Sequence, residues 1–78
     1  MNNEDRYKVS FLNINNYELI FFENQIELVI KCPKKNTSLA YNKIYKEFSY
    51  RLKGDDKAYK FITDNFNKLV KLNNITNY

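Results

Sequence analysis

Two consecutive asparagines, Asn15 and Asn16, separate two strand-like runs, and this pair constrains the fold more than any other feature of the sequence. The run 7–14 precedes the pair, and the run 17–23 follows it. Asparagine tolerates positive φ better than most residues, so the pair suits a two-residue hairpin turn. Such a turn fixes which residues face each other along the hairpin. The sequence therefore predicts an antiparallel hairpin over residues 7–23.

A third strand is expected over residues 26–32, because this run is rich in β-branched residues and ends at Pro33. Asn24 and Gln25 are a second candidate for a two-residue turn. The run 17–32 is also compatible with a helix, but its asparagine-rich breaks favour strands. With two-residue turns the register pairs Lys8 with Glu23 and Glu18 with Lys31, which are opposite charges in both cases.

Residues 37–72 follow helical spacing and predict two helices joined by a short link. Apolar residues of the first helix are Ala40, Tyr41, Ile44, Tyr45, Phe48 and Leu52, and those of the second are Tyr59, Ile62, Phe66, Leu69 and Val70. Gly54 suits a left-handed stop of the first helix, and Asp55 or Asp56 suits the start of the second. The expected fold is α+β: a three-stranded antiparallel β-meander followed by an antiparallel helical hairpin packed on one face (βββαα).

The 78 residues are expected to form a single small α+β domain, 1–78, with residues 1–6 and 73–78 as frayed tails. Cys32 is the only cysteine and the chain has no histidine, so neither a disulfide nor a metal site is expected. Seven tyrosines and six phenylalanines supply the apolar area that a core of this size needs. No cofactor is expected.

The predicted sheet is apolar on both faces, and two helices can cover only one of them. We expect the helices on the face of Leu12, Leu19 and Ile30. The opposite face then carries an exposed apolar group, which is typical of an interaction surface. The candidate interface residues are Tyr7, Val9, Phe11, Ile20, Phe22 and Val29. The alternative is that the register is wrong, or that one of the two chain ends folds over this group.

Charge divides the chain into two unequal parts. Residues 1–30 carry two basic and five acidic residues, whereas residues 31–78 carry eleven basic and four acidic residues. The expected helices are therefore basic, with candidate binding residues Lys43, Lys46, Arg51, Lys53, Lys57, Lys60, Lys68 and Lys71. Such a face binds phosphates or an acidic protein surface, or is simply solvated. Several of these lysines have acidic neighbours at helical spacing, which favours solvation.

Catalytic motifs are missing from the sequence: there is no histidine, no G-x-S-x-G and no P-loop. We therefore expect no enzyme and no small-molecule substrate. The first hypothesis is a non-catalytic protein-binding module of the kind found among phage or mobile-element accessory proteins, which inhibit a host factor or defence complex by occupying a surface. Its partner would be such a host complex or a second copy of itself.

The alternative is a small basic nucleic-acid-binding protein that uses the lysine-rich helices. No apolar run approaches the length that spans a bilayer, and no secretory signal is evident, so a cytoplasmic location without membrane contact is expected. The abundance of asparagine, lysine, isoleucine and tyrosine is typical of an AT-rich genome.

Overall fold

The hairpin expected around Asn15 and Asn16 is present. The structure is a computed structural model that describes residues 6–75 and 78, apart from the side chains of Tyr50 and Arg51. Strand β1 (Lys8–Ile14) pairs with β2 (Tyr17–Glu23) in the predicted register, which places Lys8 opposite Glu23. Asn15 and Asn16 have φ values of 51° and 68°. Both turn residues are therefore left-handed, as a primed two-residue turn requires.

Strand β3 (Glu27–Cys32) pairs with β2 in a register two residues away from the predicted one. Phe22 lies opposite Val29, and Lys31 lies opposite Ile20 rather than Glu18. The β2–β3 pairing ends at Glu23 and Leu28, so the connecting loop is longer than two residues. Asn24 Oδ1 closes this loop by accepting hydrogen bonds of 2.8 Å from the backbone N–H groups of Ile26 and Glu27. A shift of two residues leaves every side chain on its predicted face, since faces alternate with a period of two.

The first helix expected over residues 37–53 is wrong, because this segment forms a second hairpin. A 3-10 helix (Pro33–Lys35) leads into strand β4 (Thr37–Asn42), which pairs with β3 and with β5 (Glu47–Lys53). Asn36 takes a φ of 51° and ends the 3-10 turn rather than capping a helix. The Oδ1 atom of Asn42 accepts hydrogen bonds from the backbone N–H groups of Ile44 and Tyr45 and so closes the β4–β5 loop.

The expected second helix is present but divided into α1 (Asp56–Asp64) and α2 (Phe66–Leu72). Asn65 separates them: its backbone N–H and its Nδ2 both donate to the carbonyl oxygen of Phe61. Asp55 caps α1 as expected, because its Oδ1 accepts a 3.0 Å hydrogen bond from the backbone N–H of Ala58.

Gly54 does not stop a helix; it connects β5 to α1. A Cβ atom at this position would lie 2.0 Å from the carbonyl oxygen of Asn36, so only glycine fits. Thr37 Oγ1 beside it accepts a 3.0 Å hydrogen bond from the Asp55 N–H and donates one to the Lys35 carbonyl. These contacts fasten the start of α1 to the start of β4.

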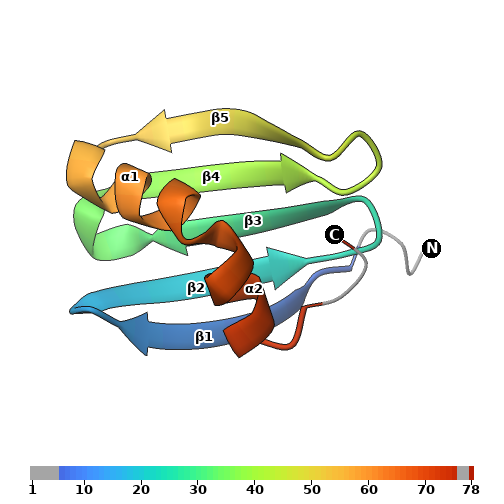
Figure 1. Ribbon diagram of the computed structural model, residues 1–78, viewed down its shortest axis with the longest axis horizontal. Helices are drawn as coiled ribbons and strands as arrows, with labels where there is room; N and C mark the ends of the chain where they lie inside the picture. The colour runs from blue at the N-terminus through green and yellow to red at the C-terminus, as the bar shows by residue number, and fades with distance from the viewer. Residues whose placement is uncertain (1–5, 76–77) are drawn as a thin grey trace.

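One face of the sheet is covered by the helices and forms the core. The strands follow one another in the order β1-β2-β3-β4-β5, and Figure 1 shows α1 over β3 and β4 and α2 crossing β2 toward β1. The core cluster contains Leu19, Phe21, Leu28, Ile30, Cys32, Leu39, Tyr41, Ile62, Phe66, Leu69, Val70 and Ile75. The helices therefore pack on the predicted face, the one that carries Leu19 and Ile30.

The segment expected to fray after Leu72 contributes to this core. Ile75 is buried, and its backbone N–H donates to the carbonyl oxygen of Val70. The ring of Tyr78 packs edge-on against Phe66 at 6.0 Å. Residues 1–5, 76 and 77 of the expected tails lie outside the described residues. The domain is thus α+β, with five antiparallel strands in place of three. Within its described part, no helix has both the length and the apolar character needed to cross a membrane.

Candidate functional site

The sheet face opposite the helices carries the residues predicted to form an interface. Alternation along the strands places on this face Val9, Phe11 and Asn13 of β1, Glu18, Ile20 and Phe22 of β2, Glu27, Val29 and Lys31 of β3, and Ser38, Ala40 and Asn42 of β4. We call it the open sheet face. Its apolar members on the first two strands are cross-strand partners: Val9 lies opposite Phe22, and Phe11 opposite Ile20. These four residues form the β1–β2 apolar patch.

The six predicted interface residues differ in how much surface they present. Phe11 is the most exposed, at 69%, and Tyr7 and Val9 are also exposed. Ile20 and Phe22 are half-buried. Val29 is only 4% exposed, so it is not available for contact. The exposed centre of the patch is therefore Phe11 and not Phe22.

Phe22 is held by two neighbours on the open sheet face. The ring of Tyr7 meets it edge-on, with centroids 6.4 Å apart, and Lys31 Nζ lies 5.0 Å from the Phe22 centroid. The Tyr7 hydroxyl in turn donates a hydrogen bond to the Glu27 carboxylate. An edge-on aromatic pair and a cation over a ring face are both favourable. These contacts hold the Phe22 ring in place on the open sheet face.

The predicted basic helix face does not exist as one surface. Lys43 and Lys46 lie in the β4–β5 loop, and Arg51 and Lys53 belong to β5. Lys43 is only 8% exposed, because its Nζ lies 2.7 Å from the Glu23 carboxylate. The sequence predicts these four residues on a helix, and this prediction is wrong because the segment pairs as two strands.

The other four predicted basic residues do lie on helices. Lys57 and Lys60 belong to α1, and Lys68 and Lys71 to α2; all four are exposed. Their surface is not uniformly positive. Lys60 Nζ lies 3.1 Å from Asp64, one helical turn away. Two aspartates, Asp56 and Asp64, are exposed on α1 together with these four lysines on α1 and α2, so the surface is only moderately basic.

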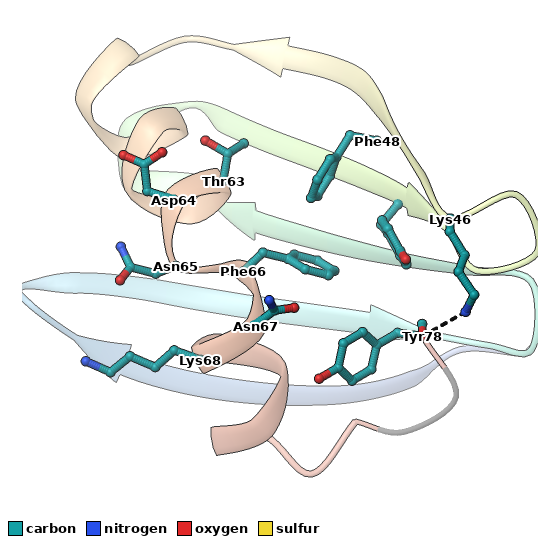
Figure 2. Close-up of a pocket in the computed structure, with 10 residues that line it drawn as sticks. Lys46, Phe48, Thr63, Asp64, Asn65, Phe66, Asn67, Lys68 and Tyr78 are labelled. Carbon is teal, nitrogen blue, oxygen red and sulfur yellow. Dashed lines mark hydrogen bonds between the residues drawn. The ribbon is translucent and has the colours of Figure 1, made fainter.

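An aromatic groove lies between the β4–β5 hairpin and the junction of α1 and α2, and sequence reasoning missed it. The groove has a volume of about 620 Å³. The rings of Tyr41, Phe48, Phe66 and Tyr78 line it, and Figure 2 shows the last three around the opening. Phe66 is central, since its centroid lies 4.7 Å from that of Tyr41 and 4.9 Å from that of Phe48.

The chain's own Tyr78 occupies one end of this groove. Lys46 Nζ donates a 2.9 Å hydrogen bond to the Tyr78 main-chain oxygen, drawn as a dashed line in Figure 2. The groove could not be found from the sequence, because the sequence predicts Phe48 on a helix and Tyr78 in a frayed tail. The pairing of β4 with β5 places Phe48 opposite Tyr41, and α2 and the end of the chain bring Phe66 and Tyr78 against them.

Side chains that could support metal binding or acid–base chemistry are dispersed. Among the described residues, no group of three or more cysteine, aspartate or glutamate side chains is arranged to hold a metal ion. Cys32 is buried in the core at the end of β3. The pKa of the Asp55 carboxyl is lowered, chiefly by the hydrogen bond from the Ala58 N–H, which is what a helix cap does.

Comparison with known proteins identifies no relative: no family model matches the sequence, and no curated protein and no solved structure matches it.

Proposed function

We propose that the protein is a small, non-catalytic protein-binding module that contacts its partner through the open sheet face. One observation carries the proposal: the β1–β2 apolar patch leaves Val9 and Phe11 exposed beside the half-buried Ile20 and Phe22. An isolated exposed apolar residue needs no explanation, but a contiguous group usually marks an interaction surface. Burial of such a patch by a partner is favourable in proportion to the apolar area that leaves water.

Charges on the same face favour a protein partner over a nucleic acid. Glu18 and Glu27 flank the patch along β2 and β3; Glu18 is paired with Lys34 at 2.6 Å, so Glu27 is the carboxylate that would repel phosphates most. Lys31 is directed at the ring of Phe22. Stacking of bases on the exposed ring of Phe11 would therefore bring the phosphate backbone close to carboxylates, without a line of cations to offset the repulsion. An apolar protein surface meets no such penalty.

Binding of nucleic acid through the helices is the second candidate, and the exposed Lys57, Lys60, Lys68 and Lys71 favour it. Phosphate contacts make affinity fall steeply as salt rises. An electrophoretic shift with random duplex DNA at several salt concentrations tests it. We expect weak binding at physiological salt. Tight, salt-sensitive binding that Lys60→Glu with Lys68→Glu abolishes would instead make this the leading function.

The experiment that tests the protein-binding proposal compares Phe22→Ser with the wild type as baits in a lysate of the source organism. Captured proteins are identified by mass spectrometry. We expect a specific partner on the wild type and its loss on Phe22→Ser, because aromatic residues within an interface tend to dominate its energy. The fold should persist in this variant, because the core on the helix side is untouched.

The neighbouring residue provides the matched control. Phe21 is fully buried on the helix side of the same strand. Phe21→Ser should unfold the protein, as measured by circular dichroism. If Phe22→Ser keeps its fold and still captures the partner that the wild type captures, the open sheet face is not the contact surface.

A further inference from the structure

The two outer strands of the sheet differ in how they are protected against pairing. Strand β5 has a register irregularity opposite Ser38 and Leu39 and carries Glu47, Arg51 and Lys53. Bulges and charges are the usual means by which an edge strand avoids association. Strand β1 pairs with β2 without a shift over all seven residues, and its only charged residue is Lys8 at one end. β1 is therefore the unprotected edge.

The turn geometry determines which backbone groups of β1 point outward. Ile14 and Tyr17 flank the two-residue turn, so they form a hydrogen-bonded pair. The alternation of an antiparallel ladder then directs the N–H and C=O groups of Val9, Phe11 and Asn13 away from β2. Within residues 6–75 and 78, no strand pairs with this outer side. The side chains of the same three residues lie on the open sheet face.

We propose that β1 pairs antiparallel with β1 of a second copy of this chain, about a two-fold axis at Phe11. In this arrangement Phe11 faces Phe11 of the other copy, and Val9 faces Asn13 in both directions. All three residues are those whose backbone groups point outward, so each hydrogen-bonding group finds its complement. A two-fold interface requires this kind of self-complementarity.

Charge and shape along β1 agree with a second copy. Lys8 lies opposite the apolar Ile14 of the other copy, so no like charges face each other anywhere along the seven residues. Phe11, 69% exposed in the single chain, meets its own counterpart across the axis, where aromatic pairs are favourable. On the helix side, Asn73 Nδ2 donates a 2.8 Å hydrogen bond to Ser10 Oγ and helps hold β1 in place.

The consequence is one continuous sheet made from two copies. The β1–β2 apolar patches of both copies then adjoin across the axis and double the apolar surface of the open sheet face. The copy-to-copy pairing uses the edge of β1, whereas the proposed partner binding uses the face. The two proposals can therefore fail separately.

A charge-exchange experiment tests the two-fold axis. Residue 11 meets only residue 11, so Phe11→Lys alone and Phe11→Glu alone each place like charges across the axis. We expect light scattering to find the wild type dimeric and each variant monomeric at the same concentration. An equimolar mixture should form the mixed dimer, with an affinity roughly tenfold above that of either variant alone. A monomeric wild type, or a mixture that stays monomeric, overturns the proposal.

A proline pair tests the edge itself. Asn13→Pro removes an outward N–H and should yield a folded monomer, since proline is tolerated where the N–H points away from the sheet. Leu12→Pro removes an N–H that bonds to β2 and should unfold the hairpin. Phe22→Ser lies away from the edge and should remain dimeric. If Asn13→Pro folds and still dimerises, the two copies associate through another surface. If the wild type stays monomeric and binds only an extended peptide from another protein, the occupant of the β1 edge is not a second copy of this chain.

Discussion

Lys43 Nζ lies 2.7 Å from Glu23 Oε2, and the two side chains are 6% and 19% exposed. Glu23 ends β2 and Lys43 follows β4, so the ion pair spans the start of β3, which lies between those two strands. The Lys43 backbone N–H also donates to the Ile26 carbonyl at 2.8 Å. One lysine thus joins the two loops at this end of the sheet.

Removing one partner of this pair should destabilise the protein far more than removing both. Lys43→Ala leaves the Glu23 carboxylate poorly solvated, and we expect a loss of about 3 kcal/mol in the free energy of unfolding. The double variant Lys43→Met with Glu23→Leu should lose much less, because apolar residues of similar volume often replace a buried pair at little cost. Urea denaturation measures both. Equal losses would show that the pair is effectively solvated.

The aromatic groove predicts unequal effects for two neighbouring phenylalanines. Phe66 is 7% exposed and contacts three other rings, whereas Phe48 is 49% exposed on β5. Phe66→Ala should cost about 3–5 kcal/mol, because it leaves a cavity beneath the groove. Phe48→Ala removes a half-exposed ring and should cost well under half of that. Denaturant melts of the two variants check the order, and a larger loss for Phe48→Ala would contradict it.

Gly54→Ala should destabilise the protein even though alanine is small. The added Cβ would lie 2.0 Å from the Asn36 carbonyl oxygen and 2.9 Å from that of Lys35, so the backbone of one segment must move. Overpacking of this kind costs about 1–3 kcal/mol. The matched control is Ser49→Ala, on an exposed position of β5. Thermal melts of both variants test the prediction, and a Gly54→Ala melt equal to that of the control would refute the close approach.

Acid should weaken the start of α1 through Asp55. The hydrogen bond from the Ala58 N–H lowers the pKa of this carboxyl below its ordinary value of 3.8. A lowered folded-state pKa means that the ionised cap stabilises the protein above pH 3.8, and that this stabilisation disappears as the pH falls through the lower, folded-state value. Asp55→Asn, which still caps but does not titrate, should match the wild type at neutral pH and lose less stability in acid. Thermal melts across this pH range measure the difference.

The first hairpin and both sheet faces could be predicted because their determinants are local. Asn15 and Asn16 take positive φ without help from distant residues, and a two-residue turn leaves one register. The β3 side chains lie on their predicted faces although the loop at Asn24 is longer than predicted, because the register differs from the predicted one by two residues and not by one. The interface candidates on β1 and β2 lie on the expected face for this reason.

The residues of Thr37–Lys53 fit both a helical and a strand pattern, and the helical prediction is wrong. Thr37, Leu39 and Tyr41 lie on the helix side of β4, and Ser38 and Ala40 lie on the other side, as the alternation of a strand requires. The same stretch also shows apolar residues at helical spacing. Local sequence does not separate the two readings. Pairing with β3 decides between the two patterns, because it gives the backbone of β4 hydrogen bonds to a neighbouring strand instead of to its own helical turns.

The sequence alone therefore determined the turn-forming asparagines, the assignment of the β1 to β3 side chains to the two sheet faces and the cap at Asp55, all of which depend on residues a few positions apart. Only the tertiary structure decided that Lys43 is buried against Glu23, that Phe48 and Tyr78 share a groove, and that β1 is the unprotected edge of a five-stranded sheet. Each of these depends on contacts between segments far apart in the chain. Such contacts form only when a segment gains more from a distant partner than from its own local preference.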